Sequence, residues 1–109
     1  MNVEQLSKTE GFRALAMPKP EREITGVYIG DLLSWVMGRA KEGDAWITIM
    51  SNNNIVAVAT LADIACIILA EGVTLDKSVF ECAMSKGINI LSSALPAYET
   101  AMAIQSSEI

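Results

Sequence analysis

The feature that most constrains the fold is an alternation between short apolar runs, rich in β-branched residues, and segments with a helical pattern. Each apolar run ends in glycine or a small polar residue before the next helical segment begins. This alternation is typical of a mostly parallel α/β sheet covered by helices. It also places polar residues at the carboxyl ends of the strands, where open sheets of this class bind ligands. The predicted strands are 24–29, 45–50, 65–69 and 88–91.

The length of the chain predicts one domain. A sequence of 109 residues is long enough to bury roughly 60–70% of its unfolded surface in a single core. Two prolines make 18–23 a loop, but this loop is too short to separate two domains. We therefore predict a single domain over 1–109, with its core between about residues 3 and 104.

Composition excludes several functions. The net charge is −5 and the eight basic residues are scattered, which argues against binding to nucleic acid. The longest uncharged stretch, 45–62, is interrupted by polar residues at 51–54, so no membrane span is predicted. The first residues lack the pattern of a signal peptide, and a cytoplasmic protein is expected. Because 51% of the residues are hydrophobic, part of the surface is expected to be covered by another chain.

No catalytic, metal or cofactor site is predicted. The chain has no histidine, the commonest general base and metal ligand. Cys66 and Cys82 lie in apolar or helical patterns and are expected to be buried free thiols. The glycines of 26–30 lack the lysine and serine or threonine of a phosphate-binding loop. The carboxylates lie beside helix and strand ends, where caps and solvated turns explain them.

Periodicity predicts helices over 2–10, 31–40, 76–87 and 95–105, and a further strand over 12–17. The helix over 31–40 is expected to begin with a capping Asp31. Apolar residues at helical spacing form its buried stripe, which consists of Leu32, Leu33, Val36, Met37 and Ala40.

The segment after Asn52 is open to two interpretations. In the first, 52–54 form a hairpin turn and 55–59 return as an antiparallel strand. In the second, an asparagine caps a short helix that runs to Asp63 and is apolar on every side. Such a helix has to be covered on both sides, and a second subunit could supply the cover. Its candidate interface residues are Ile55, Val56, Val58 and Ala59.

Small polar residues follow the predicted strands and form a candidate ligand site. Parallel strands would bring these residues to one edge of the sheet, where helix N-termini favour anions. A nucleotide or another phosphorylated small molecule is the expected ligand. The alternative is that these residues are the caps and turns that any such fold needs. The candidate ligand-binding residues are Gly30, Ser51, Asn52, Gly72, Ser92 and Ser93.

The order of these segments resembles the DRTGG domain family over roughly residues 3–104. The chain departs from that pattern at the name-giving string, whose nearest counterpart is 21–27, with Val27 where a second glycine is expected. A side chain there would impede the close approach of a ligand. The resemblance rests on the segments 24–34, 42–49, 54–59, 67–72 and 87–92.

The resemblance implies a three-layer α/β/α sandwich with a mostly parallel sheet, similar to the N-terminal domain of HPr kinase/phosphorylase. It also implies a helix after Asn52 and a homodimer. The catalytic kinase domain has no counterpart here, so kinase activity is not expected. We therefore expect a non-catalytic regulatory or interaction domain with a metabolic or signalling protein partner. The alternative is a small-molecule sensor that binds its ligand at the strand ends.

Overall fold

The computed structural model describes residues 1–107, which form one five-stranded sheet with helices on both faces. The strand order is β1-β5-β4-β3-β2, and neighbours are parallel except for β1, which runs antiparallel to β5 at one edge. In chain order the elements are α1 (Val3–Ser7), β1 (Phe12–Ala16), β2 (Gly26–Ile29), α2 (Leu33–Arg39), β3 (Asp44–Thr48), α3 (Asn54–Ala62), β4 (Cys66–Leu69), α4 (Lys77–Lys86), β5 (Ile90–Ser93) and α5 (Ala97–Ser106).

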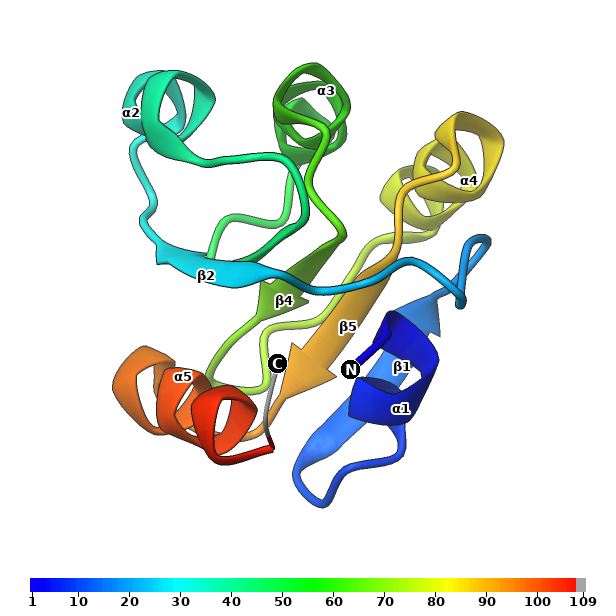
Figure 1. Ribbon diagram of the computed structural model, residues 1–109. Coiled ribbons are helices and arrows are strands. Elements are labelled where there is room, and N and C mark those ends of the chain that lie inside the picture. The colour runs from blue at the N-terminus through cyan, green and yellow to red at the C-terminus, as the bar shows by residue number, and fades with distance from the viewer. Residues whose placement is uncertain (108–109) are drawn as a thin grey trace.

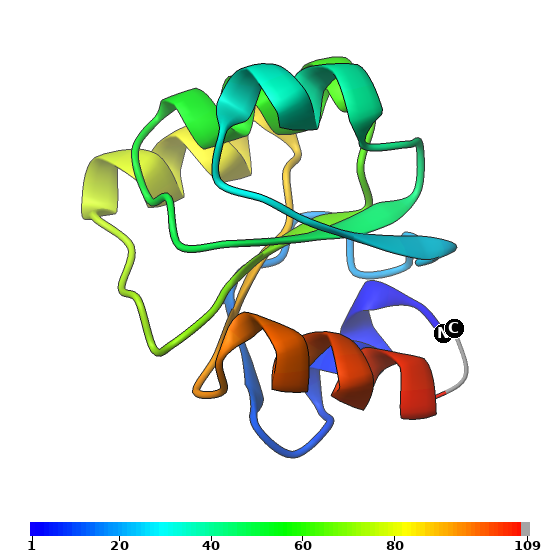
Figure 2. The same ribbon diagram turned by 90° about the vertical axis from the view of Figure 1, so that its left-hand side faces the viewer.

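The three-layer architecture is visible in both ribbon views. Helices α2, α3 and α4 cover one face of the sheet, while α1 and α5 cover the other (Figures 1 and 2). The predicted α/β class and mostly parallel sheet are therefore confirmed. Among residues 1–107, no helix is both long and apolar enough to cross a membrane.

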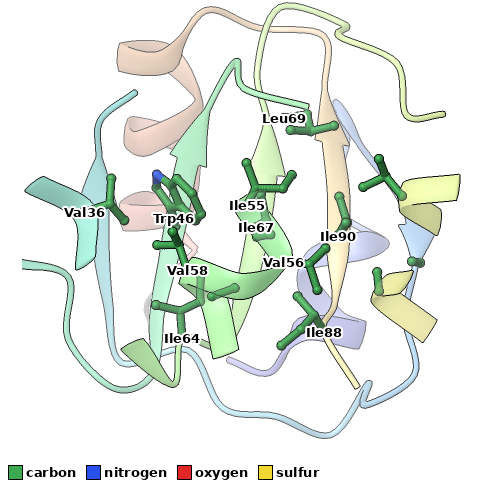
Figure 3. Packing of buried hydrophobic residues seen from close by; sticks show 14 residues of the cluster. Val36, Trp46, Ile55, Val56, Val58, Ile64, Ile67, Leu69, Ile88 and Ile90 are labelled. Carbon is green, nitrogen blue, oxygen red and sulfur yellow. The ribbon is translucent and has the colours of Figure 1, made fainter. Parts of the chain in front are cut away.

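Two apolar clusters, one on each face of the sheet, form the core. Strands β3 and β4 are buried at every position, because helices cover both of their faces. The upper cluster, under α2, α3 and α4, surrounds the fully buried Trp46 (Figure 3). The indole Nε1 of Trp46 donates a hydrogen bond to the carbonyl of Gly30, at 2.8 Å, and so anchors the end of β2.

The segment after Asn52 is a helix and not a hairpin, as the family resemblance implied. The interface assignment made for this helix is wrong, because its apolar side chains point into the domain's own core (Figure 3). The sheet below and α2 and α4 beside it supply the cover that a second subunit was expected to give. The four residues, all buried, are Ile55, Val56, Val58 and Ala59.

Helix α2 differs from its prediction. It begins at Leu33, and the only buried side chain it contributes is that of Val36. Leu32 and Met37 are exposed, and Leu33 and Ala40 are only half-buried. Figure 1 shows the reason: α2 is the outermost helix of its layer, beside the edge strand β2, so less of its surface is covered. Periodicity marks the apolar side of a helix, but the helix's place in its layer decides how much of that side is buried.

Candidate functional site

The six candidate ligand residues lie at the carboxyl edge of the sheet, as the parallel strands require. Gly30 follows β2, Ser51 and Asn52 follow β3, and Gly72 follows β4, while Ser92 and Ser93 end β5. They do not converge on one point, because β2 and β5 lie on opposite sides of the two central strands. Binding of a ligand by these residues remains a prediction. In the structure some of them make structural hydrogen bonds, and others border a hollow.

The end of β2 is occupied by structural hydrogen bonds. The amide of Gly30 donates to the carbonyl of Ile47, at 3.2 Å, and continues the pairing with β3. Asp31, which was predicted to cap α2, instead accepts from the Thr48 hydroxyl at 2.8 Å and from the Ile49 amide at 3.0 Å. The carboxylate of Asp31 therefore joins the ends of β2 and β3, and α2 begins without a side-chain cap.

Asn52 closes a turn before α3, whose N-cap residue, Asn53, makes no side-chain cap bond. The Oδ1 of Asn52 accepts a hydrogen bond from the amide of Asn54, at 3.0 Å, at the start of α3. This is the role that the alternative interpretation gave to the polar residues. Ser51, next to it, is half-buried.

Ser92 and Ser93 point to opposite faces of the sheet, since successive side chains alternate along a strand. The Ser93 hydroxyl is fully buried, 2.7 Å from the hydroxyl of Thr100 on α5, and it also accepts from the amide of Leu95. Ser92 lies on the other face and borders a hollow. Ser93 is therefore a packing residue, and Ser92 keeps its candidate role.

A hollow of about 650 Å³ opens at the carboxyl edge, where β1, β5 and α4 meet. Strand β1 contributes Arg13 and Leu15, and Arg13 is paired in register with Ser92 of β5. The loop 72–75 and the first turns of α4, including Lys77 and Phe80, form the opposite wall. This volume falls in the range of small-molecule sites. Two of the six candidates, Gly72 and Ser92, border the hollow.

Backbone hydrogen bonds to the end of β5 hold the loop that borders the hollow. The amide of Glu71 donates to the carbonyl of Leu95 at 2.9 Å, and that of Gly72 donates to the carbonyl of Ser93 at 2.8 Å. Both residues adopt the left-handed conformation, with φ of +59° and +69°. Glu71 has a side chain in a conformation that favours glycine, so the bonds to the end of β5 offset a local strain.

The charge of the hollow is opposite to that of the chain. Arg13 and Lys77 border it, and no aspartate or glutamate among residues 1–107 does, although the sequence has 13 acidic and eight basic residues. Neither cation forms a salt bridge with any of residues 1–107. The hollow therefore offers two positive charges without competing carboxylates, which suits an anionic ligand.

Sequence reasoning missed Arg13, Lys77 and Phe80. The basic residues are scattered along the sequence, and nothing local brings Arg13 close to Lys77. The missing information was the position and direction of β1, which runs antiparallel to β5 and so begins at the carboxyl edge. The sequence holds one indication of this site: in β1 the charged Arg13 is followed two positions later, and so on the same face, by the apolar Leu15.

The segment that corresponds to the family's name-giving string lies at the other end of the sheet. Gly26 opens β2 opposite Asp44, and a Cβ on Gly26 would collide with the Asp44 carboxylate. The amide of Thr25 donates to the carbonyl of Gly43 at 2.9 Å. Val27 pairs with Ala45 and packs on the core cluster under α1 and α5. Its side chain therefore lies away from the hollow and does not obstruct it.

Cys66 does not have the setting of a catalytic nucleophile. Burial raises the pKa of the Cys66 thiol to about 12, and the smaller opposing effect is the charge of Arg22. Cys66 is therefore a thiol at neutral pH, and Cys82 is a free, half-buried cysteine on α4. Among residues 1–107, no group of three histidine, cysteine, aspartate or glutamate side chains is placed to hold a metal ion.

Comparison with solved structures identifies the same fold in a regulatory protein. The chain is similar to the crystal structure of the CBS and DRTGG domains of the regulatory region of Clostridium perfringens pyrophosphatase, complexed with the activator diadenosine tetraphosphate. The TM-score is 0.73 at 16% sequence identity, over 94% of this chain and 45% of that chain. This chain thus spans less than half of the length of that one. No curated protein sequence matches it.

The family itself is shown by sequence. The sequence model of the DRTGG domain matches residues 17–107, which is most of the chain and includes every helix and strand from β2 to α5. The similar structure is a regulatory region that contains a domain of this kind. The chain belongs to the DRTGG domain family.

Proposed function

We propose that this DRTGG domain is a non-catalytic regulatory domain that binds a nucleotide or another phosphorylated small molecule in the hollow at the carboxyl edge. The observation that carries this proposal is a pair of cations, Arg13 and Lys77, in a hollow that no carboxylate of residues 1–107 borders and with no salt bridge to those residues. Phosphate oxygens are strong acceptors for guanidinium and ammonium donors. The net charge of −5 makes a general attraction for anions unfavourable, so the local pair has to supply it.

The similar solved structure supports the nucleotide class. It is a regulatory region with CBS and DRTGG domains, and its activator is diadenosine tetraphosphate. A DRTGG fold therefore occurs in a region that responds to a nucleotide. For this chain, we propose that the response begins with binding in its own hollow.

The side chains of the hollow support binding without catalysis. Ser92 and Thr74 are the hydroxyl groups that border it, and the groups beside them are cationic or apolar. A serine or threonine nucleophile needs a general base, and within the described part of the chain neither an imidazole nor a carboxylate borders this hollow. We infer that a bound ligand changes the affinity of the domain for a protein partner and is released unchanged.

Isothermal titration calorimetry at constant ionic strength tests the proposal. The probes are AMP, ATP, diadenosine tetraphosphate and ribose 5-phosphate. Arg13→Gln and Lys77→Gln are each expected to weaken binding about ten-fold or more, because each removes one charged hydrogen-bond donor.

Matched controls remove the same charge elsewhere. Lys86→Gln lies at the other end of α4, and Arg39→Gln lies on α2, where its guanidinium stacks on Trp35. Both are expected to leave the affinity unchanged. No measurable binding of any probe, or equal losses in the controls and in the hollow variants, would contradict the proposal.

We also propose that the domain forms a homodimer through the edge strand β2 and the residues that follow it. Apolar side chains are exposed around this edge, at Ile29, Leu32, Trp35 and Ile49. The amide of Ile49 is bonded to Asp31, so both segments belong to one surface. An edge strand also presents unpaired backbone groups to a partner.

Sedimentation velocity from low to high micromolar concentration tests the dimer. The double variant Leu32→Ser, Trp35→Ser is expected to be monomeric where the wild type is dimeric. Leu61→Ser is the control, since Leu61 is more exposed, at 71%, but lies on α3. A wild-type protein that stays monomeric at high micromolar concentration would contradict the dimer and leave ligand binding untouched.

A further inference from the structure

The hollow has a charged rim and an apolar interior. Both β1 and α4, which form two of its walls, contribute a basic residue followed along the chain by an apolar one. In β1, Arg13 is followed on the same face by Leu15. In α4, Lys77 is followed one turn later by Phe80. Strand β1 begins at the carboxyl edge, where Phe12 pairs with Ser93, and runs inward from there. Helix α4 also begins on the carboxyl side of the sheet, after the loop that leaves β4.

Because both elements run inward from this edge, each places its cation at the opening and its apolar side chain deeper. Leu15 also packs on the core cluster under α4, together with Val73 and Leu75 of the neighbouring loop. Phe80 remains 39% exposed, so part of its ring is uncovered. A ligand that fills this hollow has to present an anion at the rim and a flat apolar group in the interior.

We propose that the ligand is a nucleoside monophosphate, with its phosphate at Arg13 and Lys77 and its base against Phe80 and Leu15. This inference rests on the proposed function and specifies its ligand. A phosphate monoester carries close to two negative charges at neutral pH, which the two cations match. An aromatic base supplies the flat apolar group, and stacking on an aromatic side chain is favourable for every base.

Other phosphorylated ligands match the hollow less well. A sugar phosphate satisfies the rim and leaves the Phe80 ring uncovered. A nucleoside without phosphate leaves both cations unpaired. A tetraphosphate brings more negative charge than the two cations offset, within a chain whose net charge is −5.

Calorimetric titrations with AMP, adenosine, ribose 5-phosphate and diadenosine tetraphosphate test the inference. AMP is expected to bind at least ten-fold more tightly than each of the other three. Phe80→Ala is expected to weaken AMP about ten-fold and to leave ribose 5-phosphate unchanged. Met84→Ala, on the next turn of α4 and similarly exposed, is the control and is expected to bind AMP as the wild type does.

A second measurement does not depend on any variant. In NMR spectra of the wild-type protein, AMP is expected to shift the ring protons of Phe80 and to give contacts between them and the base protons. Ribose 5-phosphate that binds as tightly as AMP, or diadenosine tetraphosphate that binds more tightly, would overturn the monophosphate assignment while the proposed function stood. Absence of binding by every phosphorylated probe would overturn both.

Discussion

The two ends of the sheet use the same kinds of residue in different ways. At the amino end, the Arg22 guanidinium donates to the carbonyl of Asp63 at 2.7 Å and lies 3.0 Å from its carboxylate. The amide of Lys41 donates to the buried carboxylate of Asp44 at 2.8 Å. At the carboxyl end, Arg13 and Lys77 border a hollow and form no salt bridge with residues 1–107.

This difference between the two ends of the sheet bears on where a ligand site is expected. The segment nearest to the family's name-giving string lies at the amino end, where its residues pack closely against the loop 41–44 and form a backbone hydrogen bond with it. There, backbone turns and hydrogen bonds account for the residues. At the carboxyl end, such bonds account for Asn52 and Ser93 but not for Arg13 and Lys77, and this difference is why we propose the ligand site beside the two cations.

The largest expected effect on stability is at Gly43, at the amino end of the sheet. Gly43 has a φ of +84°, and a Cβ there would collide with the Thr25 hydroxyl. Gly43→Ala is expected to lower the free energy of unfolding by about 3 kcal/mol, from left-handed strain and displacement of Thr25. The control is Gly72→Ala, where φ is +69° and the Cβ would meet nothing within 4 Å. It should cost only about 1 kcal/mol.

Urea denaturation followed by circular dichroism measures both variants. Equal losses at Gly43 and Gly72 would contradict the comparison, because conformational strain alone would then explain the amino end.

Val27 tests whether the departure from the family string matters for binding. Val27→Gly restores the second glycine and is expected to destabilise the domain by about 2 kcal/mol, through lost packing and a more flexible unfolded chain. Because Val27 lies in β2 beside Ala45, away from the hollow, the affinity for AMP should stay the same. Calorimetric titration of the folded variant checks this. A gain in affinity would show that the ligand approaches the amino end instead.

The outcome at both ends shows what the sequence could and could not predict. The strands and their carboxyl edge were predictable because β3 and β4 are buried on both faces and so read as continuous apolar runs. The helix after Asn52 was not decided by periodicity, because an apolar run of this length suits either element. The buried strand that follows at once, which suits a parallel sheet, and the family resemblance both favoured the helix that the structure contains.

The candidate site was only partly predictable, for a physical reason. Gly72 and Ser92 border the hollow because parallel strands end together, which local patterns can indicate. Arg13 joins them through the pairing of β1 with β5, two strands far apart in the chain. A bulge between Ala14 and Ala16 then shifts the register of this pair. Strand order and bulges are set by tertiary packing, so the two cations could not be brought together from the sequence.

The thiol of Cys66 measures how well the amino end is closed. Its pKa is about 12 in the folded protein and 9.0 in the reference state, so above pH 9 the unfolded chain loses a proton that the folded chain keeps. Stability is therefore full below pH 9 and falls as the pH rises, by about 1 kcal/mol at pH 10 for this group. Urea denaturation at pH 8 and pH 10 should show this loss in the wild type. The loss should be smaller by that amount in Cys66→Ala, and equal losses would show that the thiol is accessible.

The smallest effect on stability is also the most direct comparison of the two ends, because it removes one arginine from each. Arg22→Gln is expected to lower the free energy of unfolding by about 1 kcal/mol, since it breaks a partly exposed ion pair and the bond to the Asp63 carbonyl. Arg13→Gln has no such bonds to break and should change it by less than about 0.5 kcal/mol. In the calorimetric titration with AMP the order reverses: Arg13→Gln weakens binding and Arg22→Gln does not. If Arg13→Gln destabilised the domain as much as Arg22→Gln, Arg13 would be a structural residue. A cation whose role is to bind a ligand contributes little to the free energy of unfolding of the unliganded domain.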